Sequence, residues 1–183
     1  MEGIYQIEER RGYYWVVFDN NFNQELTPEI RRILSLEKRI QFGKMFNQPI
    51  DNLPNSITHI KFVWDSAFNQ PLDNLPMSLK SLVFNGKSKF NYPLDNLPEF
   101  LEHLETGSSF NHPIDNLPSS LITIKFGNNL NQSVNNIPRT VKNIFFNQEK
   151  PKIWSFMDQS SHSGSITYDS LKTNNWIEED DDF

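Results

Sequence analysis

Four aspartates recur at the same place in a repeated motif, and their spacing could support metal chemistry. They are Asp51, Asp73, Asp95 and Asp115. If the motifs stack as neighbouring strands, the carboxylates lie about 5 Å apart, and clustered oxygen ligands suit calcium. The sequence lacks the spacing of calcium-binding β-rolls and of EF-hand loops, however. An Asx-type turn, in which each carboxylate accepts N–H groups of the following Asn and Leu, is the simpler interpretation, so we expect neither a metal nor a cofactor.

The other residues suited to catalysis are not spaced as a site. Cysteine is absent from the sequence, which excludes thiolate nucleophiles and thiolate zinc sites. His59 and His103 should face the same way on strands two apart, with Ser81 between them. The sequence pairs no nucleophile with a base, and it has no phosphate-binding glycine loop and no metal-ligand motif. We therefore predict that the protein is not an enzyme.

One asparagine occurs in each copy of the motif, and a structural role explains it best. The members are Asn23, Asn47, Asn69, Asn91, Asn111 and Asn131. A repeated amide side chain can bond backbone groups of its own turn and of the next, and so satisfy polar groups in a buried bend. We predict a structural ladder of these residues beside a core stack of Phe46, Phe68, Phe90 and Phe110.

These residues belong to a repeat whose period sets the architecture. The copies are FNQPIDNLPNSITHIKF from Phe46, FNQPLDNLPMSLKSLVF from Phe68, FNYPLDNLPEFLEHLET from Phe90, FNHPIDNLPSSLITIKF from Phe110 and LNQSVNNIPRTVKNIFF from Leu130, with an eroded copy upstream. A period of about 20–24 residues is too short for two helices and suits one strand with an irregular return. The prolines in the returns, such as Pro71 and Pro76, favour an extended or short 3₁₀ path.

The repeat predicts about seven parallel strands on one face of a mainly β, right-handed solenoid. Their expected ranges are 13–18, 37–42, 57–62, 79–84, 101–106, 121–126 and 141–146. Alternation places Ile60, Leu82, Leu104, Ile124 and Ile144 inward, with Phe62, Phe84, Phe126 and Phe146 two residues later. Thr106 breaks the Phe series, so that unit should pack less tightly. Glycines that follow strands, such as Gly43 and Gly127, suggest turns with a positive φ.

The unit FNxPLxxLPxSLxxLxFG resembles the FNIP repeat, a leucine-rich-repeat-like family of giant DNA viruses and social amoebae. The resemblance covers about residues 13–147, and its terminal units depart from the motif. It implies a leucine-rich-repeat-like fold and a non-catalytic protein-interaction module that takes part in host interaction if the source is viral. The segment 26–36, LTPEIRRILSL, also resembles the opening of an F-box. A lone helix on the solenoid is the preferred interpretation there, because a three-helix domain has no room.

Charge and composition divide the 183 residues into regions. The expected domains are an N-terminal cap at 1–12, the solenoid at 13–147, a C-terminal cap at 148–177 and an acidic disordered tail at 178–183. The solenoid contains 12 basic and 12 acidic residues, so it lacks the basic field that nucleic acids attract. With no signal peptide and no apolar run that could span a membrane, we expect a cytoplasmic protein, in the host cytoplasm if it is viral.

The outward face of the sheet is the expected binding surface, because its residues vary while the inward ones do not. The candidate partner-binding residues are Trp15, Val17, Arg39, Gln41, His59, Lys61, Val63, Ser81, Val83, His103, Glu105, Thr123, Lys125, Asn143 and Phe145. Solenoids recurrently use such surfaces to bind proteins, so we expect an unidentified protein partner, without nucleic acid or membrane. Three alternatives stay open: a solvated face with no partner, a ubiquitin-ligase subunit with an adaptor site at 26–36, and a self-assembling component joined through the sheet face or the tail.

Overall fold

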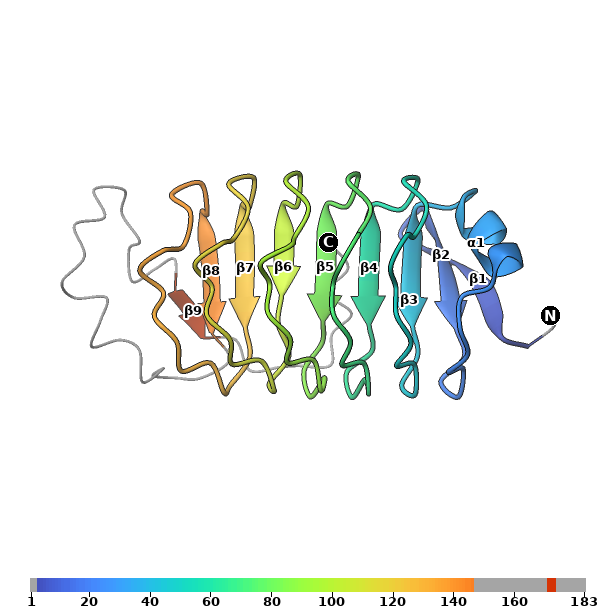
Figure 1. Cartoon of the computed structure of the whole chain (residues 1–183), viewed down its shortest axis with the longest axis horizontal. Coiled ribbons are helices and arrows are strands. Elements are labelled where there is room, and N and C mark those ends of the chain that lie inside the picture. Colours follow the sequence, from blue (N-terminus) through green and yellow to red (C-terminus); the bar gives the residue numbers. More distant parts are fainter. Residues whose placement is uncertain (1–2, 147–170, 174–183) are drawn as a thin grey trace.

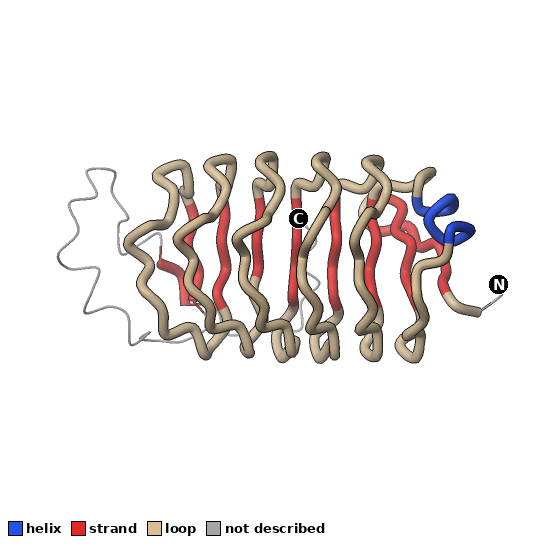
Figure 2. Tube along the Cα trace, viewed as in Figure 1, coloured by secondary structure: helices blue, strands red, loops and turns tan. Residues whose placement is uncertain are grey.

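The computed structural model describes residues 3–146 and 171–173, which form one sheet of nine strands in chain order (Figures 1 and 2). The strands are β1 (Tyr5–Arg10), β2 (Tyr13–Phe18), β3 (Arg39–Phe42), β4 (His59–Phe62), β5 (Ser81–Phe84), β6 (His103–Glu105), β7 (Thr123–Phe126), β8 (Asn143–Phe146) and β9 (Leu171–Thr173). From β2 onward, neighbouring strands pair in parallel, whereas β1 is antiparallel to β2. The expected cap at 148–177, apart from β9, and the tail at 178–183 lie outside the described residues.

The predicted leucine-rich-repeat-like solenoid is confirmed, and its seven expected strands correspond to β2–β8. Strands β3–β8 begin two residues later than predicted. Those two residues form the bend that leads into the strand: the N–H of Ile57 donates to the Pro54 carbonyl at 3.0 Å, and that of Thr58 to the Lys38 carbonyl at 2.8 Å. The two additional strands, β1 and β9, pair with the edges of this set.

The first return contains the single α-helix of the described residues, α1 (Pro28–Leu34). Thr27 caps it, because its hydroxyl accepts the N–H of Ile30. Ile30 and Leu34 are buried in the solenoid core, so these apolar side chains are not available to an adaptor. The other described returns consist of turns and extended chain without a 3₁₀-helix.

The core is two sets of side chains that repeat from coil to coil. Ile40, Ile60, Leu82, Leu104, Ile124 and Ile144 lie in register along the sheet and are all buried. The rings of Phe84 and Phe90 belong to one coil and stack with their centroids 4.0 Å apart. Between coils, the ring of Phe62 stacks on that of Phe84 with a centroid distance of 4.9 Å. Such aromatic pairs stabilise a core by about 0.5–1.5 kcal/mol beyond the burial of their area.

The glycines that follow strands are required for close packing and not for a positive φ, so the expectation about their φ is wrong. A Cβ atom on Gly127 would lie 2.3 Å from the carbonyl oxygen of Gly107, and one on Gly43 would lie 2.4 Å from that of Asp19. The described glycines with positive φ are Gly3, Gly12 and Gly86. Successive coils therefore approach backbone to backbone at this bend.

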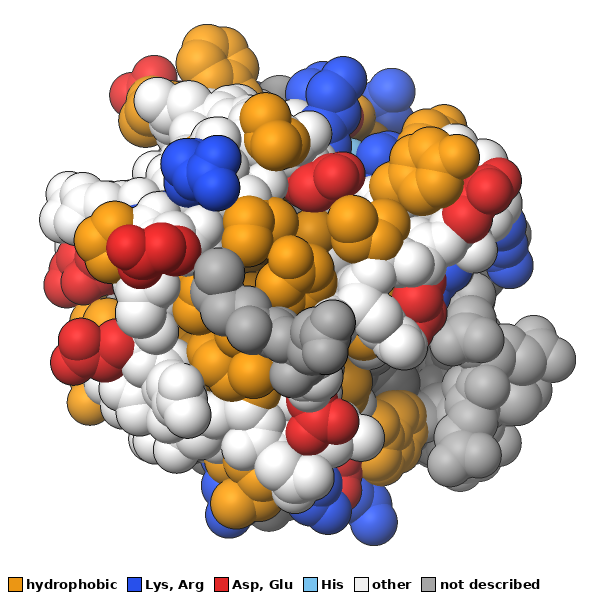
Figure 3. Space-filling model, turned by 90° about the vertical axis from the view of Figure 1, so that its right-hand side faces the viewer, with side chains coloured by type: hydrophobic (Ala, Val, Ile, Leu, Met, Phe, Trp, Pro, Cys, Tyr) orange, Lys and Arg blue, Asp and Glu red, His pale blue; other side chains and the backbone are white. Residues whose placement is uncertain are grey.

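The open N-terminal end of the solenoid shows the same core in cross-section (Figure 3). Hydrophobic side chains gather at its centre inside a rim of polar and charged ones. Ile7 and Tyr14, from β1 and β2, are 55% and 58% exposed, whereas Phe18 at the end of β2 is buried. The edge of β2 is covered by β1, which carries Glu8, Glu9 and Arg10, and charges on an edge strand discourage further pairing.

The asparagines form a continuous ladder of hydrogen bonds from coil to coil. Each Oδ1 atom accepts the backbone N–H of the Asn in the next coil, from Asn23 to Asn131, at 2.8–2.9 Å. Gln48, Gln70 and Gln132 donate Nε2 to the backbone and side-chain oxygens of the same Asn residues. The ladder is not buried as expected: Asn47 is half-buried and the others are exposed, because the side chains lie along the surface parallel to the stacking direction.

The aspartates form a second ladder and not the expected Asx turns. The Nδ2 atom of Asn96 donates to Oδ1 of Asp73 at 3.0 Å, that of Asn116 to Asp95 at 2.9 Å, and that of Asn136 to Asp115 at 2.7 Å. Each of these three carboxylates is therefore bonded to the coil that follows it. Within the described residues, no group of three or more His, Asp or Glu side chains is placed to hold a metal ion.

Serine hydroxyl groups form a third set of hydrogen bonds between coils, which was not among the predictions from the sequence. The hydroxyls of Ser56, Ser78 and Ser120 donate to the carbonyls of Leu34, Ile57 and Leu101 in the preceding coil, at 3.2, 2.8 and 2.5 Å. The signal for it was the serine two positions after LP in most copies. In the third copy Phe100 replaces this serine and is 62% exposed.

The break at Thr106 predicts a stabilising substitution. The side chain is fully buried where other coils place a Phe, and its Oγ1 atom has no hydrogen-bond partner. A buried unsatisfied hydroxyl costs about 1–3 kcal/mol, and valine has the same shape without it. We expect Thr106→Val to raise the free energy of unfolding by about 1 kcal/mol in urea titrations. Thr106→Ser, which keeps the hydroxyl and loses a methyl group, should be destabilising, and the opposite order would contradict this account.

The Asn ladder predicts a moderate loss of stability when one rung is removed. Asn91→Ala deletes the oxygen that accepts the Asn111 N–H. Because this N–H lies at an exposed residue, water can replace part of the bond, and we expect a loss of about 0.5–1.5 kcal/mol. The matched control is Asn55→Ala, at an exposed asparagine outside the ladder, which should change the unfolding midpoint little. Equal midpoints for the two variants would show that the ladder does not stabilise the fold.

Candidate protein-binding face

The outward side chains of β2–β8 form two rows across the sheet. The first row is Trp15, Arg39, His59, Ser81, His103, Thr123 and Asn143, and the second is Val17, Gln41, Lys61, Val83, Glu105, Lys125 and Phe145. Val63 follows β4 directly. The register therefore brings the fifteen candidate residues together on one surface, which we call the outer face. Parallel pairing without a slip produces this arrangement.

The outer face is less open than expected for a solvated sheet surface. Trp15, Val17, Lys61, Ser81 and Glu105 are buried, Asn143 is exposed, and the other nine are half-buried. At the N-terminal corner β1 explains part of this burial, because its residues 6, 8 and 10 face the same way as Val17, Trp15 and Tyr13. The guanidinium of Arg10 lies 5.9 Å from the ring centroid of Trp15.

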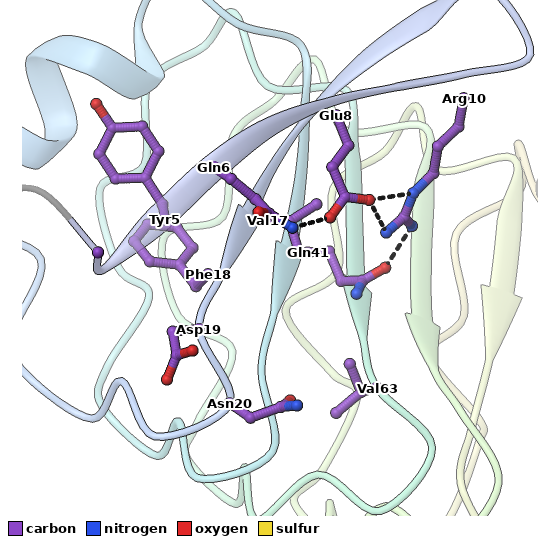
Figure 4. Close-up of a pocket in the computed structure, with 11 residues that line it drawn as sticks. Tyr5, Gln6, Glu8, Arg10, Val17, Phe18, Asp19, Asn20, Gln41 and Val63 are labelled. Atoms are coloured by element: carbon purple, nitrogen blue, oxygen red, sulfur yellow. Dashed lines mark hydrogen bonds and ion pairs between the residues drawn. The ribbon is translucent and has the colours of Figure 1, made fainter.

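A polar network links β1 to this corner of the outer face (Figure 4). Arg10 donates Nε and Nη2 to Oε2 of Glu8, at 3.0 and 2.6 Å, and Nη1 to Oε1 of Gln41 at 2.7 Å. The Arg10 side chain holds the pKa of Glu8 below its usual range. The sequence predicts residues 1–12 only as a cap, so Glu8 and Arg10 are functional candidates that only the structure adds. Their signal was the alternation of polar residues at 6, 8 and 10.

A cavity of about 360 Å³ opens beside this network. Its walls combine apolar side chains, including Tyr5, Val17 and Val63, with the polar groups of Glu8 and Gln41 (Figure 4). Three of the candidate partner-binding residues, Val17, Gln41 and Val63, meet there. A pocket with apolar walls and a few fixed polar groups suits one anchoring side chain of a partner.

Cations predominate on the outer face. The two rows contain three cationic side chains, Arg39, Lys61 and Lys125, and one carboxylate, Glu105. Their net charge is therefore +2. Nζ of Lys125 lies 3.5 Å from Oε1 of Glu105. Arg39 also stacks over Tyr13, with its guanidinium carbon 3.8 Å from the ring centroid, a cation–π contact that fixes its position.

The two histidines on the outer face are neutral at pH 7. Burial, together with smaller contributions from the charges of Arg39 and Lys80, lowers the pKa of His59 to about 4, and the charge of Glu102 opposes this shift. Burial also lowers the pKa of His103 to about 4, with a contribution from Lys125. Ser81 lies between the two rings in the register. His59 Nδ1 is 2.8 Å from the Thr58 hydroxyl, which holds this ring against its own strand.

Comparisons with known proteins agree with this geometry. A family model described as FNIP Repeat matches residues 38–63, 68–96, 90–129 and 110–149. CroV588, a giant-virus protein whose crystal structure is described as a novel circular LRR structure, is similar to this chain with 34% sequence identity and a TM-score of 0.68. The match covers 78% of this chain and 21% of that protein, so the chain spans about a fifth of its length. No curated protein matches the chain. In the described part of the chain, no helix has the length and apolar character needed to cross a bilayer.

The histidines predict a loss of stability in mildly acidic solution. Because the folded-state pKa values of His59 and His103 lie near 4, below the ordinary value of about 6.5, the unfolded chain binds protons more readily between these values. The two neutral imidazoles therefore make their full contribution to the free energy of unfolding above about pH 6.5, and this contribution is lost as the pH falls toward 4. We expect His59→Gln/His103→Gln to flatten the dependence of Tm on pH between about 4.5 and 6.5.

His112→Gln is the matched control for this measurement. His112 lies outside the outer face, at a position where other coils carry Gln, and contacts the Asn91 carbonyl. Its substitution should leave the slope of Tm against pH unchanged. If the double variant keeps the wild-type slope, burial of the two imidazoles does not control stability in this range.

Proposed function

The chain belongs to the FNIP repeat family, and we propose that it is a non-catalytic protein-binding module whose partner docks on the outer face. FNIP and leucine-rich repeats form scaffolds that generally serve protein interaction. The observation that carries the proposal is the contrast between the two sides of one sheet. Ile or Leu fills the inner row from β3 to β8, whereas the neighbouring outer row changes from Arg39 to His59, Ser81 and His103.

The outer face offers a partner one long dimension. Seven strands at about 4.8 Å spacing extend roughly 29 Å from β2 to β8. Because strands of four residues are only about 13 Å long, a standard interface of about 800 Å² per partner would also include the loops beside the strands. The cavity beside Glu8 and Gln41 adds a concave site at one end of this surface, where an anchoring side chain would be enclosed.

The charges favour an acidic partner segment with apolar anchors. Arg39 and Lys61 lie beside Val63 and Val83 on the N-terminal half of the face. A positive surface attracts acidic segments over about 10 Å at moderate salt, and valine side chains add apolar contact. We place this binding in the cytoplasm, which is the host cytoplasm if the chain is viral; the similarity to CroV588 supports a viral source.

Charge reversal at Arg39 tests the proposal. Arg39→Glu should abolish capture of partner proteins from amoebal lysate, scored by quantitative mass spectrometry. Loss of its contact with Tyr13 costs about 0.5–1 kcal/mol, which lowers Tm by about 1–4 °C at this size. Arg32→Glu is the matched control, because Arg32 is exposed on α1 and away from the outer face.

The two variants separate the possible outcomes. Proteins captured by wild type and by Arg32→Glu, but not by Arg39→Glu, would support the outer face. Equal capture by Arg39→Glu, or selective loss with Arg32→Glu, would move the interface to the return side and reject the proposal.

A further inference from the structure

We propose that the cavity beside β1 binds a neutral carboxamide, the side-chain group of an asparagine or glutamine that the partner inserts as its anchor. This inference rests on the proposed function, because it specifies which side chain enters the concave end of the outer face. The closing experiment uses small amide probes in place of the partner, so the two proposals can fail separately.

Two side-chain amides on the cavity wall present N–H groups in a fixed orientation. Gln41 and Asn20 both line the cavity, and in Figure 4 Gln41 lies toward the top of the view and Asn20 toward the bottom. Oε1 of Gln41 accepts Nη1 of Arg10 at 2.7 Å, and Oδ1 of Asn20 accepts the backbone N–H of Lys44 at 3.1 Å. Guanidinium and backbone N–H groups only donate. These bonds therefore fix both amide oxygens and leave Nε2 of Gln41 and Nδ2 of Asn20 to donate to a ligand.

The same cavity offers acceptors. In the part of the chain that the structure describes, Oδ1 of Asp19 accepts the N–H of Asn21 at 2.8 Å, and its Oδ2 atom has no hydrogen-bond partner. Gln6 donates Nε2 to Oε1 of Glu8, so its own Oε1 is available to accept. A carboxamide matches a wall that carries both kinds of group, because its oxygen accepts and its NH2 group donates twice.

The charges of the wall favour a neutral ligand. Nε and Nη2 of Arg10 both bond Oε2 of Glu8, so these two charges compensate each other. Asp19 has no ion pair among the described residues, and its negative charge disfavours a carboxylate. A lysine or arginine head would pair with Asp19, but it has only donors and would face the N–H groups of Gln41 and Asn20. A carboxamide meets neither conflict.

Apolar side chains suit the stem that carries this group. Tyr5, Val17 and Val63 line the cavity together with the polar groups. Such a combination of apolar walls and a few oriented polar groups is typical of ligand sites. The volume of about 360 Å³ is near the lower end of the roughly 300–1,000 Å³ of such sites, which suits a single side chain.

NMR titration of the isotope-labelled full chain with blocked amino acids tests the proposal. The probes are the N-acetyl methylamides of glutamine, asparagine, glutamate and methionine, with methyl glucoside as a hydroxylated control. We expect the better of the two amide probes to shift the side-chain NH2 signals of Gln41 and Asn20, with a Kd on the order of 1 mM. The methionine probe lacks the hydrogen-bonding groups and the glutamate probe is repelled by Asp19, so both should bind about tenfold more weakly.

Gln41→Glu removes one donor and keeps an oxygen for Arg10. A carboxylate oxygen then replaces Nε2, so we expect the amide probe to bind about tenfold more weakly. Gln24→Glu is the matched control, because it makes the same change at an exposed glutamine that is not among the lining residues, and it should leave binding unchanged.

Four results would each overturn the carboxamide assignment. They are tightest binding by the methionine or the glutamate probe, equal binding by methyl glucoside, unchanged binding of the amide probe to Gln41→Glu, and no saturable shift with any probe up to about 20 mM, well above the expected Kd. The comparison of probes on the wild-type chain does not depend on how well the variant folds.

Partner capture separates this inference from the proposed function. Gln41→Glu should lower the capture of partner proteins from amoebal lysate, whereas Gln24→Glu should not. Unchanged capture by Gln41→Glu, with capture lost in Arg39→Glu, would overturn the anchor and leave the proposed function standing. If the amide probe binds the cavity while Arg39→Glu captures the same proteins as wild type, the proposed function fails and the carboxamide site remains.

Discussion

Unslipped parallel pairing of successive coils is the constraint on which the rest of this structure depends. Because Ile40 pairs with Ile60, and Ile60 with Leu82, each inward side chain lies beside its counterpart one coil away. The same repeat places each Asn oxygen next to the backbone N–H of the following Asn. The same residue type at the same position of every coil thus fills the core and provides the hydrogen bonds of the polar backbone. The sequence repeats because every coil has these same two requirements.

Departures from the repeat have local consequences, because each coil contacts only its neighbours. Thr106 interrupts a Phe column and leaves a buried hydroxyl without a partner, and Phe100 interrupts the serine ladder and projects into solvent. Both lie in the third full copy. In a globular core one such change would be absorbed by many neighbours, whereas here it weakens one interface between coils.

The sequence was sufficient for the strands, their register and the core, because these features repeat. It was not sufficient for three others. The pairing of β1 depends on one hairpin that has no counterpart among the repeats. The carboxylate of Asp73 bonds Asn96 and not its own turn, and the choice between these partners depends on the separation of the coils. The glycines that follow strands are needed because the backbone of the preceding coil lies too close for a Cβ atom. The sequence of a single strand does not indicate that contact.

The outer face shows the same division within the candidate site. Its membership follows from alternation, so every residue from Trp15 to Phe145 could be placed on it from the sequence. Its exposure could not, because Arg10 and Gln41 meet across 31 positions of the chain, and nothing in the repeat indicates that contact. Stacking fixes the inward side chains and leaves the outward ones free to vary. The information that distinguishes this solenoid from another with the same core therefore lies in the outer rows.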